Sequence, residues 1–167
     1  AFLQMLKRYR SRRPINGVLM AISVADLIDA NEQQIESYGK KIRGRIDEVM
    51  TQLQMVVPVY VLFTKVDLIA GFNEFFGDMK KSDRQQPWGA TLKLNADKAN
   101  PAAIFEAEFD QLIKQVHAKS LKRLTTERMR EPREKIYQFP LEFAGIRKNL
   151  ADFIGTTFAG NSFQGTP

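Results

Sequence analysis

The chain has 167 residues, of which 44% are hydrophobic and 26% charged, the balance of an ordinary globular domain. It contains no cysteine, which excludes disulfides and thiolate metal sites, and its single histidine, His117, leaves little material for histidine metal sites or serine–histidine catalysis. The net charge of +6 is compatible with an acidic partner, an anionic membrane surface or nucleic acid, and the chain has no run of about 18 apolar residues that could span a membrane.

The first third of the chain predicts a strand between two helices. Phe2, Leu3 and Leu6 follow the pattern of the end of an amphipathic helix, so we expect the chain to be a piece of a longer protein. Residues 18–24 form a short apolar run that predicts a buried strand. A helix start follows at residues 29–32, where Glu32 is placed to complete a capping box. The next apolar residues recur at spacings of three or four and predict one helix face: Ile35, Tyr38, Ile42, Ile46, Val49 and Leu53.

A second buried strand is predicted at residues 59–63, directly after Pro58, and it ends in a Thr-Lys-x-Asp motif. Strand, helix and strand together make a βαβ unit with parallel strands. Ligands of open α/β sheets bind at the carboxyl ends of such strands, where Thr64, Lys65 and Asp67 stand. In GTPases a motif of this kind binds the guanine base, because a carboxylate accepts two N–H donors from one edge of the base. The alternative is a solvated Lys65–Asp67 pair that caps the next helix.

The second half of the chain is predicted to hold a short helix at residues 68–76 and an irregular segment at 77–100. Trp88 either anchors that segment or presents an exposed aromatic ring to a partner. Asn100 and Pro101 predict the start of a helix that ends near Pro132. Residues 135–139 predict a third strand, stopped by Pro140, and a final helix carries Phe143, Ile146, Leu150 and Phe153.

This order of elements is that of the carboxyl-terminal part of a GTPase-like P-loop NTPase fold. We therefore expect an α/β fold in three layers with a mainly parallel sheet and a helical extension. Residues 1–158 form the partial domain, and residues 159–167 form a linker or tail. The sequence contains no G-x-x-x-x-G-K-[ST] loop, so this chain holds no phosphate cradle and cannot hydrolyse a nucleotide by itself.

The sequence resembles the IcmF/TssM family, the large inner-membrane proteins of type VI secretion systems. The resemblance covers nearly the whole chain and rests on four blocks that occur in the family's order and spacing: residues 12–18, 24–27, 58–72 and 137–143. Thr64, Lys65 and Asp67 match the family's base-recognition motif residue by residue. Residues 139–141 fall where GTPases place a second base-contacting loop, although Pro140 lacks the backbone N–H that such a loop donates.

The resemblance implies that the chain comes from a cytoplasmic NTPase-like domain at the inner membrane of a bacterium, with its P-loop half upstream. It implies GTP or ATP with Mg²⁺ as cofactors of the complete domain only, and no cofactor in this chain. It also implies assembly with TssL, with TssJ through a periplasmic region, and with the baseplate.

Three functions follow, and the first is a scaffold and docking domain of the secretion membrane complex. The second is a working NTPase or nucleotide-gated switch whose first half lies outside this chain. The third is a basic nucleic-acid-binding module. It is the weakest, because the two basic clusters, at residues 7–13 and 119–135, lack aromatic strands or a recognition helix.

Overall fold

The computed structural model describes residues 2–84, 88–90 and 100–158. The amino-terminal half contains α1 (Phe2–Tyr9), β1 (Val18–Ser23), α2 (Ala25–Ile28), α3 (Glu32–Leu53) and β2 (Val59–Thr64). A 3₁₀ turn, η1 (Val66–Leu68), leads to α4 (Phe72–Phe76) and α5 (Lys81–Arg84), and three longer helices follow: α6 (Pro101–Thr126), α7 (Arg130–Gly145) and α8 (Arg147–Phe158). No helix among these described residues is long and apolar enough to cross a membrane.

The two strands pair in parallel, as predicted, in a register that runs from Val18 opposite Val59 to Ser23 opposite Thr64. Helix α3 makes the crossover between them. Its capping box is formed by Asn31 and Gln34, which exchange two hydrogen bonds of 2.9 Å, so the predicted role of Glu32 in that box is wrong. Ile35 and Ile46 are buried and Ile42 and Val49 half-buried on one face of α3, which confirms the predicted helix face.

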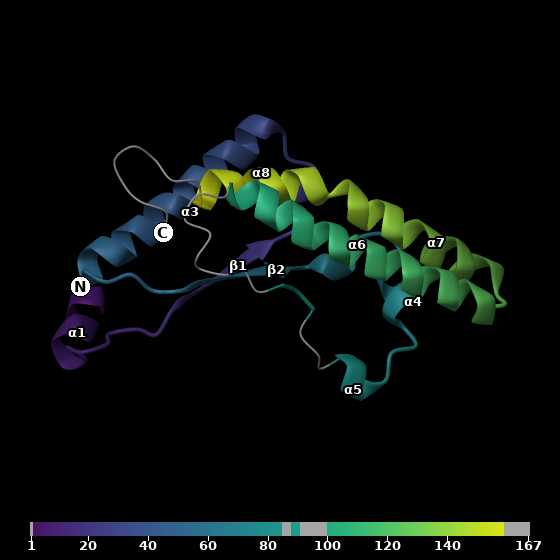
Figure 1. The fold of residues 1–167 in the computed structure, drawn as a ribbon, viewed down its shortest axis with the longest axis horizontal. Helices are drawn as coiled ribbons and strands as arrows, with labels where there is room; N and C mark the ends of the chain where they lie inside the picture. The colour runs from purple at the N-terminus through teal and green to yellow at the C-terminus, as the bar shows by residue number, and fades with distance from the viewer. Residues whose placement is uncertain (1, 85–87, 91–99, 159–167) are drawn as a thin grey trace.

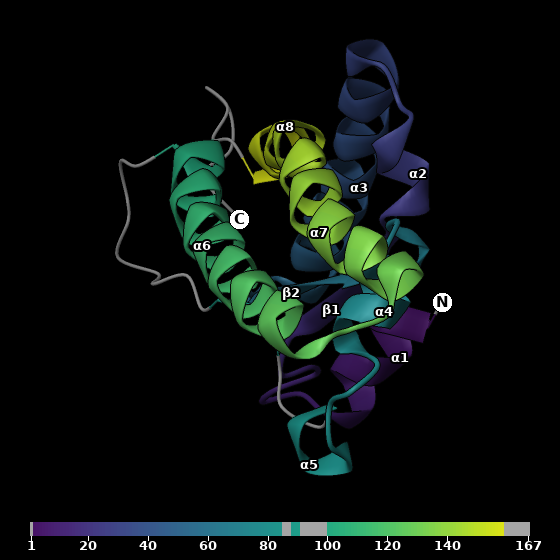
Figure 2. The ribbon, with the colours of Figure 1, turned by 90° about the vertical axis from the view of Figure 1, so that its right-hand side faces the viewer.

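The long helices lie together on one side of the two-stranded sheet (Figures 1 and 2). Between sheet and helices lies a single apolar core that includes Ile22, Ile35, Phe109, Phe139 and Phe153. Phe63 of β2 contacts Phe105 of α6 edge to face, with ring centroids 6.1 Å apart. The sheet is therefore fastened to the helical layer through its inner face.

The opposite face of the sheet is apolar and uncovered. Leu19, Tyr60 and Leu62 project from it and are 68%, 59% and 49% exposed. In the register Leu19 lies opposite Tyr60, and Ala21 lies opposite Leu62, so these side chains form one continuous patch. We call this patch the outer sheet face.

The predicted third strand is wrong, because residues 135–139 lie inside α7. Pro140 does not end that helix but occupies its interior and is buried. A proline in a helix removes the N–H that would bond the carbonyl four residues earlier, here that of Ile136. The hydroxyl of Ser120, buried on α6, donates to this carbonyl at 3.0 Å and so replaces the missing bond.

The ends of α6 and α7 also differ from the prediction. Asn100 caps α6, its side chain accepting from the N–H of Ala102 at 3.0 Å, and Pro101 is the first helical residue, as predicted. The helix ends at Thr126 rather than near Pro132, which lies in the first turn of α7, a position where proline is tolerated. Ile146 separates α7 from α8, so the predicted final helix is divided in two. The predicted tail at 159–167, and much of the segment 77–100, lie outside the described residues.

Ser120 and Pro140 should therefore be energetically coupled. Ser120→Ala leaves the buried Ile136 carbonyl without a donor and should lower the free energy of unfolding by about 1–3 kcal/mol. In a Pro140→Ala background the restored N–H can satisfy that carbonyl, so the same serine change should cost clearly less. A urea-unfolding double-mutant cycle measures the coupling. Additive effects of the two substitutions would contradict the compensation.

Candidate functional site

Thr64 is the last residue of β2 and links the two strands at the carboxyl edge of the sheet. Its hydroxyl donates to the carbonyl of Ile22 at 3.3 Å, and its own carbonyl accepts the N–H of Val24 at 2.9 Å. Both bonds join the end of β2 to the end of β1. Thr64 thus positions the loop after β2 relative to the end of β1.

Lys65 and Asp67 lie in the turn beyond the strand, and both are exposed. Lys65 has a left-handed backbone with φ of 59°, and its carbonyl accepts the N–H of Leu68 at 3.1 Å, which closes η1. The Asp67 carboxylate has no hydrogen bond or ion pair to another described residue. It is accessible to a ligand with two adjacent N–H donors.

The structure does not bring a second base-contacting loop to this edge. Residues 139–141 were predicted to form that loop, and the prediction is wrong because they lie within α7. Phe139 and Pro140 are buried there, and the ring of Phe139 packs against that of Phe75. Thr64, Lys65 and Asp67 thus form the only part of the predicted base site that the described residues supply.

Ser23 is a residue of this edge that the sequence analysis did not single out. It lies opposite Thr64 in the register, and its hydroxyl oxygen is buried without a hydrogen-bond partner among the described residues. The signal in the sequence was that Ser23 is the single polar residue of the strand predicted at residues 18–24.

The loop after β1 is held at the same edge by a side chain from α8. The Asn149 amide donates to the carbonyls of Leu27 at 2.7 Å and Ile28 at 3.2 Å, at the end of α2. Lys148 donates to Glu32 at 2.8 Å and to Asp152 at 3.0 Å, and these bonds raise the pKa of Lys148 to about 12. Helix α8 therefore fixes both the end of α2 and the start of α3.

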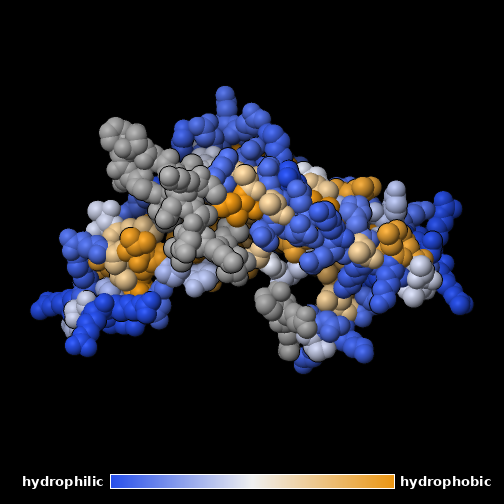
Figure 3. Space-filling model, in the orientation of Figure 1, coloured by the Kyte–Doolittle hydropathy of each residue, from blue (hydrophilic) through white to orange (hydrophobic). Residues whose placement is uncertain are grey.

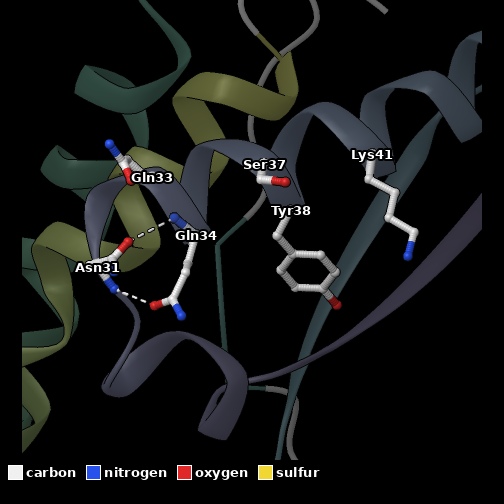
Figure 4. Close-up of a pocket in the computed structure, with 6 residues that line it drawn as sticks. All are labelled: Asn31, Gln33, Gln34, Ser37, Tyr38 and Lys41. Carbon is white, nitrogen blue, oxygen red and sulfur yellow. Dashed lines mark hydrogen bonds between the residues drawn. The ribbon is translucent and has the colours of Figure 1, made fainter.

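A shallow hollow of about 420 Å³ opens beside the first turns of α3 (Figure 4). The side chains of Tyr38 and Lys41 extend from the same side of α3 (Figure 4). Asn31 and Gln34, which exchange the two capping hydrogen bonds, also line the hollow. Burial raises the pKa of the Tyr38 phenol, and the nearby charge of Asp26 adds to the effect. The lining residues are polar or amphipathic and include no carboxylate or histidine.

A larger groove of about 660 Å³ lies between α4 and α6. Phe76 and Trp88 line it, with Gln115 and Lys119 on the α6 side. Trp88 stacks on Phe143 with ring centroids 4.9 Å apart, so it packs as the predicted anchor while 43% of it stays exposed. Neither this groove nor the hollow at α3 includes Thr64, Lys65 or Asp67. In the part of the chain that the structure describes, no group of three or more His, Cys, Asp and Glu side chains could hold a metal ion.

The whole chain, residues 1–167, matches the family described as the IcmF-related N-terminal domain. It is 38% identical over 168 residues to a curated protein of Pseudomonas aeruginosa described as type VI secretion system component TssM1. That alignment covers 99% of this chain and 15% of the relative, so the chain spans about a seventh of the length of this relative. No solved structure matches the chain.

Measurements of stability can test whether Asn149 holds the end of α2 at the carboxyl edge of the sheet. Asn149→Ala removes the hydrogen bonds to the carbonyls of Leu27, Ile28 and Ala30 and should lower the free energy of unfolding by about 1–3 kcal/mol. Asn149→Asp should cost more, because a carboxylate would then face carbonyl oxygens at the negative end of a helix. Asn73→Asp, on an exposed position of α4, is the matched control and should change stability by less than about 0.5 kcal/mol. Equal effects of the two aspartate variants in thermal unfolding would contradict this role.

Proposed function

We propose that this chain, which belongs to the IcmF-related N-terminal domain family and thus to the IcmF/TssM proteins of type VI secretion, acts as a scaffold and docking domain within the secretion complex. The observation that supports this function is the uncovered outer sheet face, formed by Leu19, Tyr60 and Leu62. The proposal concerns assembly, because the described residues expose a large apolar surface on one face of the sheet.

We expect another protein surface to bury the outer sheet face in the full-length protein. Parallel sheets are almost always buried on both faces, and a two-stranded sheet with one wet apolar face is marginal in stability. Burial of an aromatic or large aliphatic side chain contributes about 1.5–3 kcal/mol. The three large side chains of the outer sheet face therefore supply a substantial driving force for association. We propose that a protein of the secretion complex packs on this face, and that the P-loop half of the GTPase-like domain extends the sheet along its open edge.

The family suggests where such a domain works. We propose a position on the cytoplasmic face of the bacterial inner membrane, held there by other parts of the full-length protein. TssL and the baseplate are the partners we expect for the cytoplasmic region, and TssJ for a periplasmic region. We expect no nucleic acid among the partners, because the basic clusters lack the stacking platforms or recognition helix that nucleic-acid binding uses.

The second candidate function is a nucleotide-gated switch in the complete domain. It is favoured by one observation, the exposed Asp67 carboxylate at the carboxyl edge of the sheet. Asp67 would accept two N–H donors of guanine, the Lys65 stem would lie along the base, and Thr64 would hold the loop. GTP, or ATP, with Mg²⁺ would be the cofactor, with its phosphates held by residues outside this chain.

The outer sheet face can be tested in the full-length protein. The double change Tyr60→Ser and Leu62→Ser removes apolar surface from a solvent-facing position, so the fold of the chain should survive it. It should reduce type VI secretion of a marker effector at least about tenfold, because the surface that docks is lost.

The matched control is the double change Tyr137→Ser and Leu141→Ser. These residues are 64% and 54% exposed on α7 and lie away from the sheet. The control should leave secretion within about twofold of the wild type. Equal secretion by the sheet-face variant and the control, at equal protein levels, would sink the proposed docking role.

Asp67 tests the nucleotide function separately. If the complete domain binds GTP, Asp67→Ala should cost roughly 2–4 kcal/mol of GTP affinity, the range for losing charge-assisted bonds to a bound base. Thr64→Ala should cost less, since its hydroxyl bonds the Ile22 carbonyl and not the ligand. The measurement is calorimetric titration of GTP and ATP into the complete domain.

The same Asp67→Ala variant separates the two functions in cells. A scaffold keeps secretion near the wild-type level, whereas a nucleotide-gated switch loses it. Unchanged GTP affinity in Asp67→Ala would leave Thr64 to Asp67 as a structural turn without a part in base recognition.

A further inference from the structure

We propose that α1 and the arginines that follow it form a docking site for an anionic phospholipid bilayer. This surface, the α1 patch, consists of Phe2, Met5 and Tyr9 together with Arg8, Arg10, Arg12 and Arg13. It is separate from the outer sheet face and does not depend on the docking role proposed there.

The apolar part of the α1 patch is a stripe along one side of the helix. Phe2, Met5 and Tyr9 fall within roughly 60° of arc at 100° per residue. They are 66%, 53% and 79% exposed, whereas Leu3 and Leu6, on the adjoining side, are half-buried where α1 packs on α3. Helix α1 therefore packs on α3 through one apolar side and exposes a second apolar side to solvent.

The basic part of the patch is unneutralised. Arg8, Arg10, Arg12 and Arg13 are exposed, and none of them takes part in an ion pair or side-chain hydrogen bond with any residue that the structure describes. No Asp or Glu occurs in the chain before Asp26. Arg8 thus lies on the helix and the other three arginines lie in the segment directly after it, and no acidic side chain in the described part of the chain pairs with them.

The combination fits a bilayer surface better than a shaped protein pocket. An amphipathic helical segment with aromatic residues on its apolar stripe and arginines nearby is typical of helices that lie in the headgroup region. Arg10, Arg12 and Arg13 lie in irregular backbone between α1 and β1, which allows each guanidinium to reach a separate phosphate. Clusters of four or more basic residues on such helices bind anionic lipid.

The place of α1 in the molecule makes this contact sterically simple. Figure 1 shows α1 at one end of the long axis, away from α6 and α7, so a flat surface can approach it. In the space-filling view the same end shows hydrophilic residues next to hydrophobic ones (Figure 3). Membrane contact here would orient the domain and leave the sheet edge with Thr64, Lys65 and Asp67 at a distance from α1 along the strands.

The first experiment places an environment-sensitive fluorophore in the chain, which has no natural cysteine. Met5→Cys labelled with such a dye should show a blue shift and a rise in intensity with vesicles of equal phosphatidylcholine and phosphatidylglycerol. Vesicles of phosphatidylcholine alone should give a much smaller change. Tyr137→Cys, at an exposed position on α7, is the matched control and should show no shift with either vesicle.

The second experiment measures vesicle cosedimentation of charge variants. Changing Arg8, Arg10, Arg12 and Arg13 to Gln should lower partition onto the anionic vesicles at least about 100-fold, since each arginine near such a surface contributes about fivefold. The matched control changes four exposed residues elsewhere to Gln: Lys41, Lys114, Lys122 and Arg128. It has the same net charge and should lose less than about threefold. Far-ultraviolet circular dichroism confirms that each variant keeps its helices.

Three results would overturn the proposal. Equal losses in the two four-charge variants would show attraction by net charge alone. A Met5 dye that stays in a polar environment on bound vesicles would show that the apolar stripe does not enter the headgroup region. Absence of binding to anionic vesicles by the folded chain would assign the stripe to protein contact, and a concentration-dependent blue shift of the Met5 dye without lipid would identify that contact as self-association.

Discussion

The close contact of α8 with α3 is the constraint on which the rest of the structure depends. A Cβ on Gly39 would lie 2.8 Å from the Cβ of Thr156, so only glycine allows this approach. Beside it the buried Arg43 pairs with Asp47 at 3.1 Å and donates to the carbonyl of Thr157 at 3.3 Å. Because α3 is also the crossover between the strands, a shift of α8 would be transmitted to both ends of the sheet.

This contact also explains why the molecule has one covered and one uncovered sheet face. All the long helices lie on one side of the sheet, because α8 packs on α3 and does not cross to the outer sheet face. The same α8 holds the loop beyond β1 through Asn149, at the edge that carries Thr64 and Asp67. The packed side of the domain thereby supports the carboxyl edge of the sheet, while the outer sheet face stays exposed.

The sequence predicted the βαβ unit well, because each of its signals was local: two apolar runs, a helix start within residues 29–32 and apolar residues spaced along α3. It failed at α7, where Pro140 was taken as a stop. The spacing of Ile136, Phe139, Phe143 and Ile146 already fits one helix face that continues past the proline. What the sequence could not show was the hydroxyl of Ser120, 20 positions away, which makes a proline tolerable there. The position of Thr64, Lys65 and Asp67 at the end of β2 and in the turn after it was predicted correctly. The second loop predicted at residues 139–141 was wrong for the same reason as the strand before it.

The stacking of Trp88 on Phe143 also has a spectroscopic consequence. Trp88 is the only tryptophan, and it lies against Phe76 and Phe143 at the junction of α4 and α7. Its emission therefore reports on one defined junction and not on an average over the molecule. Separation of α4 from α7 would move the indole from an aromatic stack into water and shift its emission to longer wavelength, even while the far-ultraviolet signal of the helices stayed constant. The intrinsic fluorescence of the chain thus distinguishes local opening of this junction from global unfolding.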